Sequence, residues 1–321
     1  MLNVYDCSNS DERLLSRKLG GPVINEFVGL LHKYAENFGI KFVTYLDNAQ
    51  VVFTNDIFPK VVLESGLPLV KRMDGVHWQK DLVNRNFPFI KACTQADSVI
   101  FITEYSRKSF ETLYYGEYKQ LKDYQVIRHW TEALHVGKRR LNKEPVRFCA
   151  IATDWSRPEK RLHELVNFAY MYPETEIHLI GKCKEQLPTN MISYGYVGND
   201  LMKFQDILDL CDAFLNLTCK DAATKTVCTA INNKLPALFA NSGGVGELVG
   251  PYGLGIAEKD EIEILEEIPA LDPKEVYKGY AEFKYQYQNL LWNISQFHMP
   301  ASKLFNAIGG YFRVMSKVVE K

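Results

Sequence analysis

The sequence has none of the features that mark secreted, membrane-spanning or zinc-binding proteins. No apolar run approaches the roughly 18 residues that a membrane-spanning helix needs. The first residues, MLNVYDCSNSDERLL, do not follow the basic-then-apolar order of a signal peptide. The 7 cysteines are scattered and form no pair of C-x-x-C motifs, so we expect reduced, mostly buried thiols. These absences favour a cytoplasmic protein without a transmembrane segment.

What is present is the composition of an ordinary globular protein. With 321 residues, of which 46% are hydrophobic and 24% charged, the chain is long enough for two α/β domains. The net charge of −1 is unevenly spread, because residues 1–143 carry +4 and the remainder −5. The positive half is compatible with an anionic acceptor such as a phospholipid or a nucleic acid, and also with an ordinary solvated surface.

The most informative stretch is 210–256, where apolar strands alternate with loops that open helices. We expect strands at 213–217 and 235–240, each with an apolar run bounded by polar residues. A helix at 225–233 follows the first strand, and Ser242-Gly243-Gly244 opens another after the second. A helix start carries a partial positive charge, and glycines let the backbone approach a ligand closely. The stretch therefore predicts a phosphate-binding edge of a parallel sheet.

This stretch resembles the donor-binding half of family-4 retaining glycosyltransferases of the GT-B fold. Their signature is an acidic residue, seven others, and then Glu-Ala at the start of a helix. Asp221 takes the first acidic position and Ala230 the alanine, whereas Thr229 stands where the family has its second acidic residue. Lys234-Leu235-Pro236 is similar to the G-x-P that opens the next strand, and Gly243–Glu247 is similar to the GG-x-x-E loop.

The resemblance implies a donor site built from these positions. Asp221 would bond hydroxyls of the donor sugar, with capping of the following helix as its alternative role. Thr229 would offer the ribose one hydrogen bond instead of a charge-assisted pair. Glu247 would bind sugar or ribose, or would favour the first turn of its own helix. The remaining donor-binding positions are Gly243 and Gly244 in the loop, and Thr224, Lys225 and Thr226 at the helix start.

Two cations follow another predicted strand. Arg157 and Lys160 lie between the strand at 146–151 and the helix at 162–171. A basic pair opposes the helix dipole at such a position, which indicates a functional reason for it. These cations would neutralise the charge that develops on a diphosphate leaving group. The run containing them also resembles the family's W-x-x-x-K-R/G loop, whose lysine contacts the donor diphosphate.

The first half of the chain carries further candidates. Gly20 and Gly21 open an amphipathic helix after the first strand, a pattern typical of a phosphate cradle. It resembles the family's first Gly-rich loop, which faces the donor diphosphate. Asp74 and His77 follow a predicted strand at 68–73, in a segment that resembles the family's R-x-D-G. They are candidates for the reacting face, and a turn carboxylate and a structural histidine are the alternatives.

These patterns predict an α/β protein of the GT-B fold, with two Rossmann-like doubly wound domains facing a central cleft. We expect an N-terminal acceptor domain at 1–143 and a C-terminal nucleotide-sugar donor domain at 144–302. A linker is expected at 137–143, and a helix at 303–321 is expected to pack back on the first domain. No D-x-D pair follows a predicted strand, so no metal ion is expected.

The resemblance implies metal-independent, retaining transfer of a hexose from a UDP- or GDP-sugar to an acceptor hydroxyl. The nucleotide diphosphate sugar is a co-substrate, and no further cofactor is expected. The acceptor stays open between a glycan, a lipid-linked molecule and a modified nucleic acid. Two alternatives remain: a glycosyltransferase acting on hydroxymethylated bases in DNA, and a GT-B nucleotide-sugar-binding protein that has lost catalysis.

Overall fold

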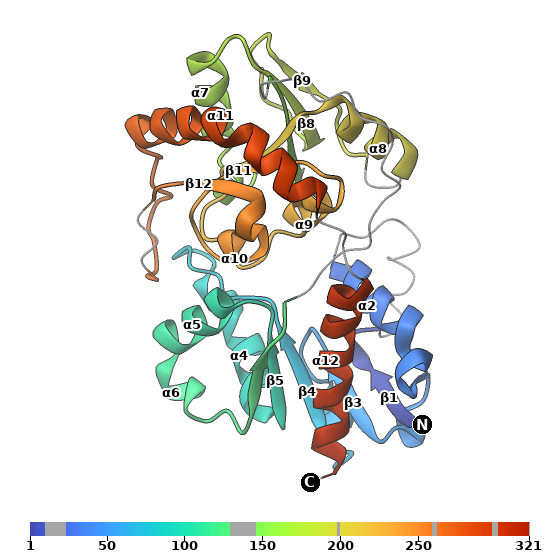
Figure 1. Cartoon of the computed structure of the whole chain (residues 1–321). Coiled ribbons are helices and arrows are strands. Elements are labelled where there is room, and N and C mark those ends of the chain that lie inside the picture. The colour runs from blue at the N-terminus through green and yellow to red at the C-terminus, as the bar shows by residue number, and fades with distance from the viewer. Residues whose placement is uncertain (10–23, 129–145, 198–199, 259–261, 297–300, 321) are drawn as a thin grey trace. The chain divides into compact units, whose positions relative to one another are not determined.

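A computed structural model describes residues 1–9, 24–128, 146–197, 200–258, 262–296 and 301–320. The chain separates into two compact units (Figure 1). The first unit comprises Met1–Trp130, Ile262–Glu266 and Pro300–Lys321, and the second comprises Thr131–Glu261 and Glu267–Met299. The boundary expected at 143/144 and the linker expected at 137–143 lie outside the described residues.

The first unit contains a 6-stranded parallel sheet in the order β2-β1-β3-β4-β5-β6. Its strands are short and apolar, and β3, β4 and β5 are buried throughout, as expected for a parallel sheet covered on both faces. The strands are β1 (Leu2–Asp6), β2 (Ile40–Val43), β3 (Val51–Thr54), β4 (Leu69–Met73), β5 (Ser98–Phe101) and β6 (Tyr124–Val126).

Helices connect and cover these strands. They are α2 (Ile24–Tyr34), α3 (Lys60–Leu63), α4 (Asn86–Gln95), α5 (Glu104–Leu113), α6 (Tyr115–Tyr118) and α12 (Ala301–Val319). Short 3-10 helices lie at Cys7–Asn9, Ala35–Phe38, Leu46–Asn48 and Val83–Arg85. Helix α12 packs on β3, β4 and β5, and it buries Ile308, Tyr311, Val314 and Met315.

The second unit contains another 6-stranded parallel sheet, in the order β12-β11-β10-β7-β8-β9. Its strands are β7 (Arg147–Asp154), β8 (Glu176–Lys182), β9 (Met191–Ser193), β10 (Ala213–Asn216), β11 (Ala237–Ala240) and β12 (Gly253–Ile256). Its helices are α7 (Leu162–Met171), α8 (Leu201–Leu210), α9 (Lys225–Asn232), α10 (Val245–Val249) and α11 (Pro273–Ser295), with 3-10 helices at Pro158–Lys160 and Gly250–Tyr252.

An aromatic cluster holds α7 and α11 against the second sheet. Phe148 of β7 lies 5.7 Å from Phe168 of α7 and 5.9 Å from Tyr280 of α11, measured between ring centroids. All three side chains are buried. Truncation of one such buried ring to alanine typically costs about 3–5 kcal/mol. The cluster therefore fixes the sheet from which the loops of the candidate site project.

The order of the second sheet reverses between β7 and β10. The chain runs from β7 to β8 and β9 on one side, and then returns to place β10 on the other side of β7. In open parallel sheets, ligands bind outside the carboxyl ends of the strands at such a reversal. The loops 155–161 and 217–224, which follow β7 and β10, therefore form the expected binding edge of this unit.

The predicted fold class is confirmed, since both sheets are parallel, doubly wound and flanked by helices. In the first unit the corresponding reversal lies between β1 and β3. Part of the loop after β1, with Gly20 and Gly21, lies outside the described residues. Within the described ranges, no helix is both long enough and apolar enough to cross a bilayer.

Candidate functional site

An ion pair joins the two loops at the reversal point of the second sheet. Lys160, from the loop after β7, donates a hydrogen bond from Nζ to Oδ2 of Asp221 in the loop after β10, at 2.7 Å. The side chains of Lys160 and Asp221 are only 12% and 21% exposed. The fold therefore brings together two candidate residues that are 61 positions apart and that were predicted separately from the sequence.

The charge state of the pair follows from its surroundings. Burial would raise the pKa of Asp221, but the charge of Lys160 and its hydrogen bond outweigh burial and hold that pKa below its usual value. Asp221 is therefore a carboxylate at neutral pH. Its second oxygen, Oδ1, accepts a hydrogen bond from the amide of Ala223 at 3.2 Å.

The loop that carries Lys160 is a 3-10 turn at Pro158–Lys160. Arg157 pairs with the carboxylate of Glu159 instead of with Asp221. The carbonyl of Glu159 accepts a hydrogen bond from the amide of Cys219 at 2.9 Å, which ties this turn to the loop after β10. The structure thus places both predicted cations on one turn and gives each a carboxylate partner.

Sequence reasoning did not single out Arg161, which anchors this turn from its other side. Its side chain is fully buried, and its guanidinium donates to the two carboxylate oxygens of Glu258 at 2.6 and 3.0 Å and to the carbonyl of Pro269 at 2.8 Å. Its backbone is left-handed, with φ 51°. Arg161 was visible in the sequence as the basic residue after Lys160. Its partner Glu258 lies 97 residues away, so the local sequence gives no sign of the ion pair.

The Gly-rich loop after β11 closes against Asp221. Gly243 has φ +72°, and a Cβ built on it would lie 2.3 Å from the carbonyl oxygen of Asp221. The amide of Gly244 donates to that same carbonyl at 2.9 Å. Next to this contact, the amide of Lys220 donates to the hydroxyl of Ser242 at 2.8 Å. Only glycine fits at position 243, because any side chain would collide with the backbone of Asp221.

Helix α9 begins directly after the Asp221 loop. Its N-cap residue is Thr224, whose side chain makes no capping hydrogen bond. The hydroxyl oxygens of Thr224 and Thr226 are buried at this helix start, and Lys225 lies half-buried between them. The helix start adds a partial positive charge close to the Lys160–Asp221 pair. One turn further along, Thr229 donates from its hydroxyl to the carbonyl of Lys225 at 3.3 Å.

Glu247 is half-buried in the first turn of the short helix α10. A carboxylate in the first turn interacts favourably with the helix dipole, which is one of the two roles that the sequence left open for Glu247. Glu247 also lies four residues after Gly243, on the same loop-to-helix connection. The second unit thus assembles Lys160, Asp221 and the two loop glycines.

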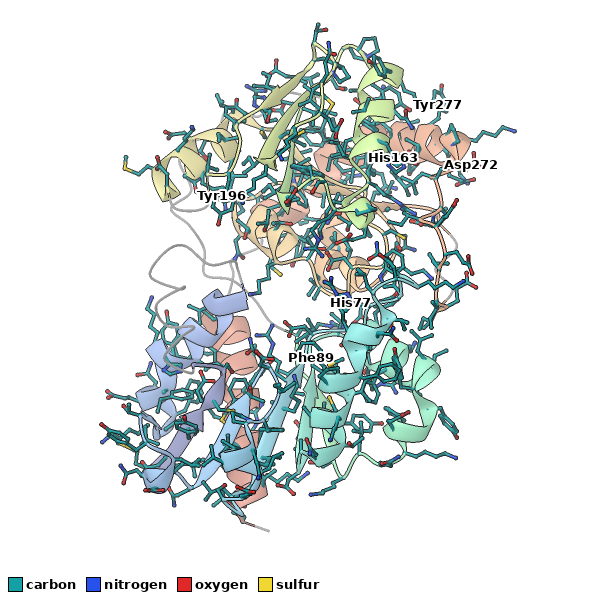
Figure 2. All side chains as sticks on the ribbon, turned by 180° about the vertical axis from the view of Figure 1, so that it is seen from behind. His77, Phe89, His163, Tyr196, Asp272 and Tyr277 are labelled. Atoms are coloured by element: carbon teal, nitrogen blue, oxygen red, sulfur yellow. The ribbon has the colours of Figure 1, made fainter. Side chains whose placement is uncertain are left out.

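Asp74 and His77 belong to the first unit, in the loop after β4, and Figure 2 labels His77. Asp74 Oδ1 lies 2.7 Å from Nε of Arg72, whose side chain is fully buried, while Asp74 itself is 41% exposed. The main chain of His77 exchanges two 2.7 Å hydrogen bonds with the amide side chain of Asn86. Arg72 and Asn86 therefore hold this loop in place. Neither residue was assigned a role from the sequence.

Comparisons with known proteins agree on the fold. No protein-family model matches the chain, and no curated protein matches its sequence. Solved structures do match, and they show that two such parallel doubly wound units make up the GT-B fold of glycosyltransferases. At the identities found, this likeness concerns the fold alone.

Three of these structures illustrate the likeness. Alr3699/HepE of Anabaena, solved in complex with UDP, has a TM-score of 0.63 and 12% identity over 99% of this chain and 100% of that chain. Sucrose-phosphate synthase of Thermosynechococcus elongatus has a TM-score of 0.64 and 10% identity over 99% and 100%. The pneumococcal O-GlcNAc transferase GtfA, in complex with UDP and GlcNAc, has a TM-score of 0.58 and 12% identity over 84% of this chain. The match covers only 57% of the length of GtfA.

Proposed function

We propose that this protein is a retaining glycosyltransferase, similar to family 4, that moves a hexose from a UDP- or GDP-sugar to an acceptor hydroxyl. The observation that carries the proposal is the meeting of Lys160, Asp221 and Gly243 at the reversal point of the second sheet. The fold shared with HepE, which was solved with UDP, supports a nucleotide diphosphate as the donor group.

The chemistry needs a place for negative charge. Transfer breaks the bond between the anomeric carbon of the sugar and a diphosphate oxygen, and it forms a new bond from that carbon to the acceptor oxygen, whose hydroxyl proton passes to the departing diphosphate. The departing nucleotide diphosphate gains negative charge in the transition state. Lys160 and Arg157, together with the start of α9, supply positive charge on one edge of the sheet. We propose that these groups stabilise the charge of the departing nucleotide diphosphate without a metal ion or further cofactor.

The other candidates take supporting roles in this proposal. Asp221 bonds hydroxyls of the donor sugar, and Gly243 and Gly244 let the loop approach the donor. Glu247 bonds sugar or ribose. Asp74 and His77 are assigned to the acceptor in this proposal, and Arg72 orients the carboxylate of Asp74.

The test is donor turnover with a panel of UDP- and GDP-sugars, in the wild type and in Lys160→Ala. Loss of transition-state charge stabilisation costs roughly 3 kcal/mol, so turnover should fall on the order of 100-fold. Lys278→Ala is the control, since Lys278 is an exposed lysine of α11 in the same unit. The proposal is wrong if no donor binds and no nucleotide is released.

A second candidate has one observation in its favour. The hydroxyl of Thr229 bonds back to its own helix at Lys225, where the family has an acidic ribose contact. A GT-B protein that binds a nucleotide sugar without transferring it would tolerate this loss. Calorimetry that detects donor binding, with no turnover across a broad acceptor screen, would favour this candidate over the enzyme.

A further inference from the structure

The cation assigned to the diphosphate already has an anionic partner. Nζ of Lys160 lies 2.7 Å from Oδ2 of Asp221, and both side chains are mostly buried. A diphosphate that binds Lys160 must therefore compete with a carboxylate of this chain. The neighbouring cation Arg157 is engaged in the same way by Glu159.

We propose that competition between Asp221 and the diphosphate for Lys160 makes this site prefer a nucleotide sugar over the bare nucleotide diphosphate. The inference rests on the proposed function and adds to it a discrimination between substrate and product. Asp221 becomes the residue that sets this preference, beyond its contact with the sugar.

The argument follows the charge of Asp221 when a ligand arrives. A bare nucleoside diphosphate takes Lys160 and leaves the carboxylate without its cation, next to another anion. An unpaired charge in a largely buried site is unfavourable. A nucleotide sugar brings hydroxyl donors that bond the carboxylate and offset this loss. After transfer the sugar is gone, so Asp221 regains Lys160 and weakens the hold on the departing nucleotide.

The geometry indicates which partner moves. Asp221 is fixed by its backbone, whose carbonyl accepts from Gly244 and lies against Gly243, and by the bond from the amide of Ala223 to Oδ1. Lys160 carries its charge on a flexible four-carbon chain. The exchange therefore takes place through the lysine, while the carboxylate stays where a sugar would meet it.

The test compares Asp221→Asn with the wild type by calorimetry, using UDP, GDP and their glucose conjugates. Asparagine keeps an oxygen for the amide of Ala223, loses the charge, and places an NH2 group where an oxygen accepts from Lys160. We expect the nucleoside diphosphate to bind about tenfold more tightly, and its preference relative to the sugar conjugate to shift by about the same factor. Inhibition of turnover by the free nucleotide should strengthen in parallel.

Glu275→Gln removes one carboxylate charge from α11 of the same unit and serves as the matched control, which should leave both affinities unchanged. If Asp221→Asn does not fold by circular dichroism, Asp221→Ser replaces it, because a serine hydroxyl also accepts from an amide two residues on.

The outcomes separate the two proposals. If no nucleotide binds the wild type, or if Lys160→Ala leaves binding unchanged, the proposed function fails. If nucleotides bind through Lys160 but the Asp221 variants leave the ratio of affinities unchanged, or weaken binding of the bare nucleotide, the competition is wrong and the proposed function stands.

Discussion

A Cβ atom on Gly243 would lie 2.3 Å from the carbonyl oxygen of Asp221, closer than real side chains come to a backbone atom. The amide of the next residue, Gly244, donates to the same carbonyl. The loop after β11 therefore rests directly on the loop that carries the carboxylate. This contact explains why the Gly-Gly pair is part of the candidate site even though it contributes no side chain.

Gly243→Ala should destabilise the protein and disturb the position of Asp221. The left-handed backbone and the steric clash together should cost about 3 kcal/mol of unfolding free energy, measured by urea denaturation. Gly66→Ala is the matched control, since Gly66 has φ +70° but open space around its Cβ position. Equal losses in the two variants would show that the clash with Asp221 is not a real constraint.

The buried pair of Arg161 and Glu258 should respond strongly to removal of one partner. Arg161→Leu leaves the carboxylate of Glu258 buried without its cation, so stability should fall by about 3–5 kcal/mol. The double variant Arg161→Leu/Glu258→Leu should recover much of this loss, as measured by guanidinium denaturation. The exposed pair Lys122–Asp97 is the reference, and Lys122→Ala should cost less than about 1 kcal/mol. Additive losses at Arg161 and Glu258 would argue against their coupling.

Thr229→Glu tests the ribose contact that the family resemblance implies. A carboxylate at this position can accept charge-assisted hydrogen bonds from both ribose hydroxyls, so UDP should bind about tenfold more tightly. The 2′,3′-dideoxy analogue of UDP is the control and should show no gain. A gain that persists with this analogue would assign the effect to something other than the ribose.

His178 should make stability depend on pH. Its ring is buried in β8, with Nδ1 2.8 Å from the hydroxyl of Tyr194 and Nε2 2.7 Å from a carboxylate oxygen of Glu176. Burial lowers the pKa of His178 from 6.5, although the charge of Glu176 opposes this shift. Below pH 6.5 the unfolded chain therefore takes up a proton before the folded protein does, and stability falls as the pH is lowered.

The measurement is urea denaturation between pH 7.5 and pH 5. His178 should contribute a slope of at most about 1.4 kcal/mol per pH unit, and His178→Gln should remove that contribution. His163 of α7, labelled in Figure 2, is the comparison position because its side chain is 56% exposed, and His163→Gln should change the slope less than His178→Gln does. Identical slopes in the wild type and His178→Gln would contradict the prediction.

The parallel fold was predictable because short apolar runs alternate with amphipathic helices. The helix expected at 162–171 is found at Leu162–Met171, and the strand expected at 213–217 is found at Ala213–Asn216. The strand expected from Leu235 begins two residues later, at Ala237. Lys234 is left-handed and Leu235 donates to the carbonyl of Ala230, so both residues end helix α9 instead.

The candidate site was only partly predictable. Motif positions identified Lys160 and Asp221 one by one, with one assigned to the diphosphate and the other to the sugar. Their ion pair could not be foreseen, because it depends on the order of β7 and β10 in the sheet. Arg72, Asn86 and Arg161 were missed for a related reason: a buried polar residue is recognised by its partners, and the sequence does not show them.

Helix α12 covers strands that were synthesised long before it. Lys317 of this helix bonds Asp123, which lies 194 residues earlier in the chain. At ribosomal rates of about 5–20 residues per second, the apolar face of β3–β5 stays uncovered for on the order of 10–40 s while the intervening chain is made. Chaperones that bind nascent chains would have their greatest effect in this interval. Although the sheet of the first unit is translated first, its helical cover is completed after that of the second sheet.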